Sequence, residues 1–413
     1  MKRLICWAIV LVMLLTALPA MADTVRISGD FQYTLKGNGT ATIVGYTGEH
    51  TDIILPNQID GYTVTTIGES AFSLEEPPMS SISVTLPNTT ISIEAKAFAN
   101  RNVFSINLPD AVEYIGYGAF MGCEAIQFRI SNNHSCFATI NGSLYNKLNK
   151  ELIQWVKSDS SDDVIVPEGI VSIGDYAFAN MHAVSIHLPE TLKKIGNYAF
   201  WTFKCSNTLI VPASVSEIGA FAFAEALNDI DISNCAQLKT IPEGAFASTC
   251  DGFTDDIDHF LSSVRIEDLP QNIKTIDAYA FYECFMLEPT LTGVESIGPY
   301  AFSGMRTAGC VINIPETCKI VDEGAFYNVV GFGEINIAQG VERIESKAFS
   351  NSCSWLEKSI YLPSSLTYIA LDAFDKEVTY IVEKGSYAER WAQDNAFIYT
   401  INGDKQNLDW LNN

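Results

Sequence analysis

The stretch Ser185–Phe200, SIHLPETLKKIGNYAF, decides the fold of this chain. Ile186 and Leu188 alternate with polar neighbours, which is the period of a half-buried β-strand. Pro189 ends that strand because proline cannot donate to a ladder. The Ala-Phe pair that closes the stretch lets the backbone approach closely at the alanine and fills the interior with the ring of Phe200. The stretch therefore predicts one strand, one turn and one buried aromatic ring.

The same pattern recurs twelve times along the chain, and each copy ends in an Ala-Phe pair. Eleven copies have Ile five residues before the Phe, and Val321 takes that place in the other copy. Most intervals are 21 to 26 residues, and two are longer, 58 and 35. A period of this length predicts a solenoid, in which each unit buries its apolar face only against its neighbours. The repeat rings are Phe72, Phe98, Phe120, Phe178, Phe200, Phe223, Phe246, Phe281, Phe302, Phe326, Phe349 and Phe374.

Stacking of the repeats predicts that these rings form one column along the array. An aromatic stripe can also line a ligand site, but its recurrence at a fixed repeat position favours a core. Burial of each ring should contribute about 1.5–3 kcal/mol to stability.

The segment Ile115–Cys123, IGYGAFMGC, resembles the repeat of a known family. BspA-like, or Treponema-type, leucine-rich repeat proteins are bacterial surface proteins whose repeat is roughly LxxIxIPxxVxxIgxxAFxxC, and the resemblance covers about residues 51–377. It implies a mostly β leucine-rich-repeat solenoid with one parallel strand per repeat on the concave side and short turns or 3₁₀ segments on the other. It also implies adhesion to host matrix or to other cells, and it supplies no functional residues to carry over.

Residues 1–22 have the pattern of a secretory signal peptide. Lys2 and Arg3 precede a short apolar run, and a small-x-small cleavage pattern ends at Ala22. A membrane anchor is the alternative, but the apolar run is short for a bilayer span. We therefore expect a secreted or extracellular chain, either free or associated with the cell surface, with no membrane insertion after cleavage.

Both ends of the array are expected to carry caps, because terminal repeats need a polar outer side. Residues 23–50 predict a small N-terminal β cap. At the other end, residues 378–413 form a C-terminal cap, in which Ser386 and Glu389 have the spacing of a helix capping box. A strand is expected at residues 397–401 after this short helix.

The two long intervals contain insertions. The first, about residues 136–156, is expected to form a β-hairpin because Asn141-Gly142 is a tight-turn signal. The second, about residues 251–263, is acidic. A calcium loop is conceivable there, but the loop spacing that calcium sites use is missing, so a solvated acidic loop is the simpler interpretation.

The net charge of the chain excludes some kinds of partner. After removal of residues 1–22, 49 acidic and 23 basic residues remain, a net charge of −26. This balance argues against nucleic acid and anionic membranes as partners.

Cys123 and Cys284 both lie three residues after a repeat Phe, which favours buried structural thiols over disulfides. No metal site and no cofactor is predicted.

No catalytic motif or dinucleotide fingerprint is present, so we do not expect an enzyme. The alternative is a hydrolase or metal-dependent enzyme built on the insertions, with His134, His259 and Asp256 as the residues to test. A purely structural display spacer is a third possibility.

The candidate site is a column of residues equivalent to His187, which lies between two inward-facing apolar residues and should point out from the concave sheet. Exposed apolar residues on a rigid concavity are typical of an interface, although solvated strand residues are the simpler alternative. We expect the partner to be an extracellular protein of host matrix or a cell surface; a glycan ligand and the oligomeric state stay open. The column consists of Ile54, Thr85, Asn107, Ile165, His187, Ile210, Asp231, Asn313, Asn336 and Tyr361.

Overall fold

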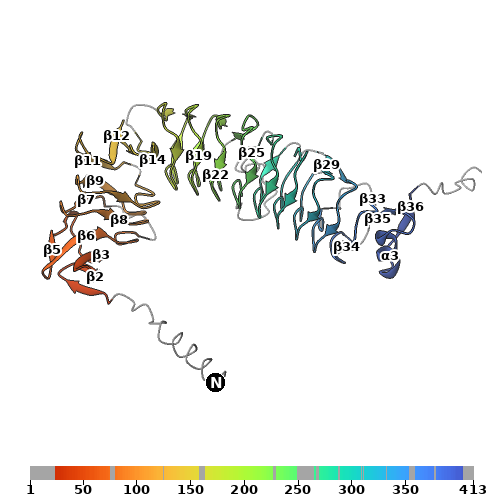
Figure 1. Ribbon diagram of the computed structural model, residues 1–413, viewed down its shortest axis with the longest axis horizontal. Helices are drawn as coiled ribbons and strands as arrows, with labels where there is room; N and C mark the ends of the chain where they lie inside the picture. Colours follow the sequence, from red (N-terminus) through yellow and green to blue (C-terminus); the bar gives the residue numbers. More distant parts are fainter. Residues whose placement is uncertain are drawn as a thin grey trace, which may run out of the picture. The chain divides into compact units, whose positions relative to one another are not determined.

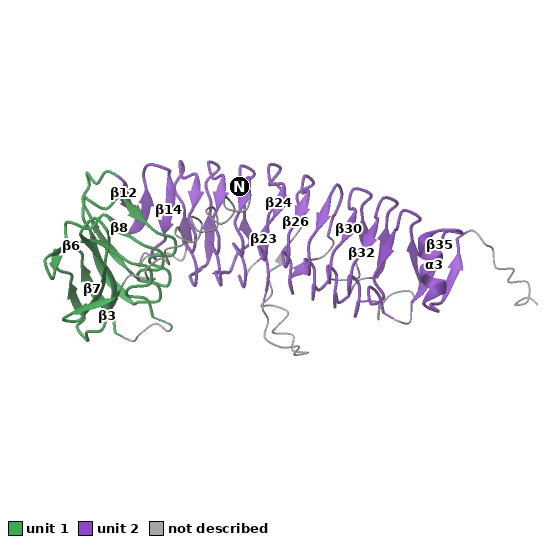
Figure 2. Cartoon of the chain, turned by 60° about the horizontal axis from the view of Figure 1, so that its bottom comes forward, with its two compact units in different colours: residues 1–135 green, residues 136–413 purple. Residues whose placement is uncertain are grey.

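The computed structural model forms two compact units, Met1–Ser135 and Cys136–Asn413 (Figure 2). The predicted signal peptide, the acidic insertion and the end of the C-terminal cap lie outside the described residues. The structure describes residues 24–74, 80–123, 125–157, 163–226, 229–248, 265–266, 269–286, 289–307, 309, 311–331, 333–352, 359–375 and 378–402.

The first unit begins with an antiparallel β cap that turns into a parallel ladder. Its strand order is β1-β2-β3-β6-β8-β10, and β5 pairs with β6. The first two pairings of this order are antiparallel, and β3 pairs with β6 in parallel. The strands are β1 (Arg26–Ser28), β2 (Phe31–Leu35), β3 (Thr40–Tyr46), β5 (Gln58–Ile59), β6 (Tyr62–Ile67), β8 (Ser92–Ile93) and β10 (Tyr114–Ile115).

A second parallel sheet of the first unit contains the strands that the sequence pattern predicts before each turn. Its order is β11-β9-β7-β4, and every pairing is parallel. The strands are β4 (Asp52–Ile54), β7 (Ile82–Thr85), β9 (Val103–Leu108) and β11 (Gln127–Ile130).

The second unit opens with the predicted hairpin. Strands β12 (Phe137–Ile140) and β13 (Ser143–Asn146) pair antiparallel around Asn141 and Gly142. Both turn residues have positive φ, 51° and 83°, which is what a two-residue hairpin turn requires. Strand β14 (Glu151–Gln154) then pairs antiparallel with β13 and in parallel with β16, so the hairpin joins the array through its last strand.

Each later turn of the second unit contributes a first strand and a second strand, which follow one another along the array (Figure 1). The first strands define the first-strand face: β15 (Asp163–Ile165), β18 (Ser185–His187), β21 (Leu209–Ile210), β23 (Asp229–Asp231), β25 (Arg265–Ile266), β27 (Phe285–Met286), β29 (Val311–Ile314), β31 (Glu334–Ile337), β33 (Ser359–Leu362) and β35 (Thr379–Val382). The second strands define the second-strand face: β16 (Ser172–Ile173), β19 (Lys194–Ile195), β22 (Glu217–Ile218), β24 (Thr240–Ile241), β26 (Thr275–Ile276), β28 (Ser296–Ile297), β30 (Ile320–Val321), β32 (Arg343–Ile344) and β34 (Tyr368–Ile369). Strands β17 (His182–Ala183) and β20 (Lys204–Cys205) form a separate parallel pair.

The second strands are an addition to the sequence prediction, which placed turns or 3₁₀ segments there. They form because each short Ile segment accepts a backbone bond from the next turn. Gly196 N–H donates to Ile173 O at 2.8 Å, and Gly219 N–H donates to Ile195 O at 2.8 Å. No 3₁₀ helix occurs in the described residues. The predicted parallel β-solenoid is confirmed, with two ladders instead of one.

The repeat phenylalanines stack as predicted within each unit. In the second unit, successive rings from Phe178 to Phe374 are stacked with centroids 4.9–5.4 Å apart. In the first unit, Phe72, Phe98 and Phe120 stack with centroid separations of 5.0 and 5.8 Å. These rings are buried, so the column forms the core of each unit.

The C-terminal cap contains the one helix in the described part of the chain, α3 (Tyr387–Asp394). Glu389 N–H donates to Ser386 Oγ at 3.0 Å, which confirms half of the predicted capping box. The Glu389 carboxylate accepts from Gly385 N–H instead of from Ser386. Trp391 is buried edge-on against Tyr380, and strand β36 (Tyr399–Ile401) pairs with β35.

Candidate functional site

The three candidate residues of the first unit lie in one row of its second sheet. Ile54 pairs with Thr85, and the pairing of Val84 with Ile106 brings Asn107 into the same row. Ile54 is 72 % exposed. Asn107 has a structural role, because its amide accepts from Leu86 N–H at 2.6 Å and donates to Leu86 O at 3.1 Å.

The next four candidates lie side by side on the first-strand face. Ile165 pairs with His187, and Ile210 pairs with Asp231. Ile165 is 68 % exposed, Ile210 is 59 % exposed, and His187 is also exposed. The Asp231 carboxylate accepts from Ser233 N–H at 2.9 Å and from the Ser233 hydroxyl at 2.7 Å, so it closes its own turn.

The last three candidates are tied to their neighbours by side-chain hydrogen bonds. Asn336 Nδ2 donates to Asn313 Oδ1 at 3.0 Å along the ladder. The Tyr361 hydroxyl donates to Glu383 at 3.0 Å. It also accepts from the amide of Gln339 at 3.0 Å. These hydrogen bonds give the three residues a role in stabilising the solenoid. The exposed side chains of Ile165 and Ile210 have no comparable structural role.

A hollow that the sequence did not predict adjoins Ile165. It has a volume of about 120 Å³ and is lined by the hairpin residues Ile140 and Tyr145, by Trp155 and by Ile165. The Trp155 ring packs on Phe178 with centroids 5.7 Å apart. The hairpin therefore extends the apolar surface of Ile165 sideways. The one sequence feature that could have indicated this hollow is the apolar residue Ile140 at the end of a strand in the insertion.

The residues of the enzyme alternative do not assemble a site in the described structure. His134 is fully buried, and its Nε2 lies 3.1 Å from Pro109 O, so it is a core histidine. His259 and Asp256 lie outside the described residues. In the described part of the chain, no group of three or more His, Cys, Asp or Glu residues could hold a metal ion.

The described cysteines are buried, in agreement with the structural thiols that the repeat position of Cys123 and Cys284 predicts. They are Cys123, Cys136, Cys205, Cys235, Cys284 and Cys318. The Cys123 thiol donates to Arg101 O at 3.0 Å, and burial raises its pKa to about 12. A thiol that stays protonated is a poor nucleophile.

The stacked parallel turns with an isoleucine and a phenylalanine at fixed places define a leucine-rich repeat protein. The chain belongs to the family described as BspA type leucine rich repeat region, whose model matches residues 65–154, 155–255 and 259–381. None of the curated proteins compared with this chain matches it. Among the described residues, no helix is long and apolar enough to cross a membrane.

Solved structures of bacterial leucine-rich repeat proteins are similar to this chain over most of its length. One is a leucine rich cell surface protein from Faecalibacterium prausnitzii, with 20 % identity, a TM-score of 0.43 and coverage of 94 % of this chain and 97 % of that one. A leucine-rich repeat protein from Eubacterium ventriosum has 18 % identity, a TM-score of 0.40 and coverage of 86 % and 95 %. A third, from Bacteroides ovatus, has 18 % identity, a TM-score of 0.35 and coverage of 91 % and 99 %.

Proposed function

We propose that this chain is an extracellular, non-catalytic recognition protein that binds a protein of host matrix or of a cell surface through Ile165, His187 and Ile210. The observation that carries the proposal is the exposure of two isoleucines, 68 and 59 %, on strands of the first-strand face. They add nothing to the core, whereas burial against a partner would contribute about 25 cal/mol per Å² of apolar area.

The strand scaffold suits this role because its backbone is already ordered before binding. Ile165 and His187 are held in register by a parallel pair, so little conformational entropy is lost when a partner docks. The hollow beside Ile165 is also lined by Asn141, Ser143 and Asp163, so it suits an anchor of the partner with an apolar ring and a polar tip, such as tyrosine.

The charge of the chain supports a partner with a basic surface. Without residues 1–22 the net charge is −26, which accelerates encounter with a positively charged protein at low salt. The contribution of charged residues at the rim of such an interface should then depend on salt concentration, whereas the contribution of the apolar centre should not.

Export is part of the proposal and rests on the signal pattern of residues 1–22. It is tested by expressing the full chain in a bacterial host and determining the mass of the exported product. A product that begins at Asp23 supports the proposal, and retention of uncleaved chain in the cells overturns it.

The binding face is tested with the double variant Ile165→Asp, Ile210→Asp. Weaker binding to a partner of the wild-type chain, with unchanged unfolding, supports the proposal. Unchanged affinity overturns it.

A further inference from the structure

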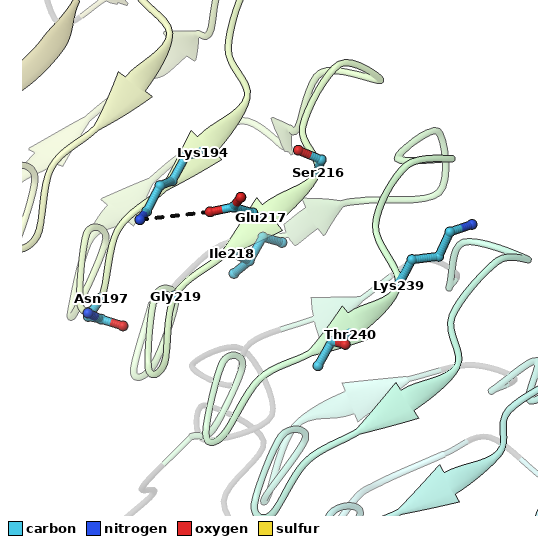
Figure 3. A pocket seen from close by; sticks show the side chains of 8 residues that line it. All are labelled: Lys194, Asn197, Ser216, Glu217, Ile218, Gly219, Lys239 and Thr240. Carbon is cyan, nitrogen blue, oxygen red and sulfur yellow. Dashed lines mark ion pairs between the residues drawn. The ribbon is translucent and has the colours of Figure 1, made fainter. Parts of the chain in front are cut away.

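The ladder of the second-strand face splits between β22 and β24 (Figure 3). Strands β12, β13, β14, β16, β19 and β22 form one sheet, and a separate sheet starts at β24. Within the described residues, no backbone hydrogen bond joins the two sheets. The split is confined to the surface, because the rings of Phe223 and Phe246 beneath it stay stacked at 5.3 Å.

The sequence explains why pairing fails at this place. Between β19 and β22, Ser216 N–H donates to Lys193 O at 2.9 Å and Gly219 N–H donates to Ile195 O at 2.8 Å. The residue equivalent to Gly219 in the next turn is Pro242, which has no N–H to donate.

A second sequence change displaces β24 from its partner. In the turn that contains β24, Ile241 follows Ile230 by eleven residues. In the preceding turn, the equivalent Ile218 follows Leu209 by nine residues, so the turn with β24 has two extra residues. The ladder resumes at once on the other side, where Lys274 N–H donates to Lys239 O at 2.8 Å.

The split opens a hollow of about 310 Å³ (Figure 3). It is lined by Lys194, Asn197, Ser216, Glu217, Ile218, Gly219, Lys239 and Thr240. Lys194 forms an exposed ion pair with Glu217 at 3.8 Å. The Lys239 side chain runs along the rim, away from Glu217. Its flexible stem allows the ammonium group to swing over the hollow.

The backbone edges of the split offer both kinds of hydrogen-bonding group. In the described structure, the carbonyls of Ser216 and Ile218 accept nothing from β24, and the N–H groups of Lys239 and Thr240 find no acceptor on β22. A peptide strand does not fit between these edges. Inserting one requires about 10 Å between the flanking strands, whereas Cα atoms of β22 and β24 lie within 8 Å.

We propose that this split binds an acidic sugar residue of a glycan. Sugar hydroxyls donate and accept at once, so they can satisfy the free carbonyls as well as the free N–H groups. A carboxylate on the sugar would be held by the ammonium group of Lys239, because Lys194 is already paired with Glu217. The net charge of the chain repels a polyanion, so the ligand carries isolated acidic groups among neutral hydroxyls. This site is on a different ladder from the proposed protein-binding face and does not depend on it.

The proposal is tested by ligand-observed NMR on the chain without residues 1–22. The probes are a glucuronate-containing disaccharide, its neutral glucose counterpart and a capped Gly-Glu-Gly peptide. Saturable binding of the acidic disaccharide, at least about tenfold tighter than the other two probes, is expected. Absence of saturable binding, or equal binding of the neutral sugar or of the peptide, overturns the proposal.

Variants locate the ligand. Lys239→Ala and Thr240→Val should each weaken binding of the acidic disaccharide several-fold. Lys319→Ala is the matched control, because Lys319 lies in the same ladder and pairs with Glu342 at 3.8 Å, outside the split. A loss of binding in Lys319→Ala equal to that in Lys239→Ala would assign the effect to general charge and overturn the assignment.

Discussion

The ring of Phe221 lies over Gly244 of the next turn, so closely that a Cβ on Gly244 would overlap the ring. Tyr300 and Gly324 repeat this relationship. Phe221 ends a surface stack in which Tyr198 lies 5.1 Å from it, centroid to centroid. Backbone conformation alone does not demand the glycine, because Phe221 itself has a φ of 55° and Gly244 one of 58°.

Replacing Gly244 by alanine should therefore destabilise the second unit by about 1–3 kcal/mol, because the new methyl group displaces the ring of Phe221. The free energy of unfolding in urea measures this. Gly29→Ala is the control for backbone conformation, since Gly29 has nearly the same φ as Gly244, 57°, but has nothing within 4 Å of the added Cβ.

The double variant Phe221→Ala, Gly244→Ala separates the ring contact from backbone strain. If the ring causes the loss, Gly244→Ala costs clearly less in the Phe221→Ala background. Equal costs in both backgrounds would show that the glycine is required for its conformation.

The buried thiols should be inert to alkylation in the folded chain. Burial raises the pKa of Cys123 and of Cys235 to about 12, and that of Cys318 to about 11. Because only the thiolate reacts, peptides with these three residues should stay unmodified at pH 8 and be alkylated in denaturant, by mass spectrometry. Rapid native alkylation of Cys123 would contradict its burial.

The same thiols predict a loss of stability at high pH. Their folded pKa lies above the ordinary value of 9.0, so the neutral form is favoured by folding. Below pH 9 both states are protonated and the stability is complete; from pH 9 towards pH 12 only the unfolded thiols ionise, so stability falls. Urea unfolding of wild type and Cys123→Ala between pH 8 and 10.5 measures this, and a parallel decline of both would exclude Cys123 as a contributor.

Hydrogen exchange should mark the split in the second-strand ladder. The amide of Thr275 donates to Lys239 O at 3.2 Å, whereas that of Thr240 finds no acceptor on β22 in the described structure. The Thr240 amide should exchange at least about tenfold faster than that of Thr275. Equal protection would mean that the two sheets pair in solution.

Substitutions on two neighbouring strands, β15 and β18, should separate surface residues from core residues. Ile165→Asp should change the free energy of unfolding by less than about 0.5 kcal/mol, because its side chain is exposed. Ile186→Asp, on the neighbouring strand, should cost several kcal/mol, since Ile186 is only 7 % exposed. Circular dichroism during urea unfolding measures both, and a similar loss in the two variants would contradict the assignment of faces.

The ring column, the hairpin and the capping box could be predicted because each depends on residues at fixed short spacings. Phe200 recurs at a constant position, and Asn141-Gly142 specifies its turn locally. The second ladder was missed because two-residue strands such as Lys194–Ile195 are too short to show an alternating pattern.

The sequence predicts that the candidate residues lie on the outer side of their strands. It does not predict which of them make side-chain hydrogen bonds to their neighbours. Alternation places Asn107, Ile165 and Tyr361 alike on the outer side of a strand. Only the structure separates Asn107 and Tyr361, which are hydrogen-bonded to their neighbours, from Ile165, which is exposed. The split had two signals in the sequence, Pro242 in place of a glycine and the two extra residues before Ile241.

The most direct test of the proposed recognition role is a surface binding measurement with residues 23–413 immobilised. Extracellular-matrix proteins, mucin and bacterial cells are applied at two salt concentrations to the wild type, to the Ile165→Asp, Ile210→Asp variant and to Leu371→Asp. Leu371 is a matched control, 64 % exposed and outside the first strands. We predict saturable binding that is at least about tenfold weaker in the double variant and unchanged in Leu371→Asp. Equal binding by all three proteins, or no saturable partner for a folded sample, would contradict the account.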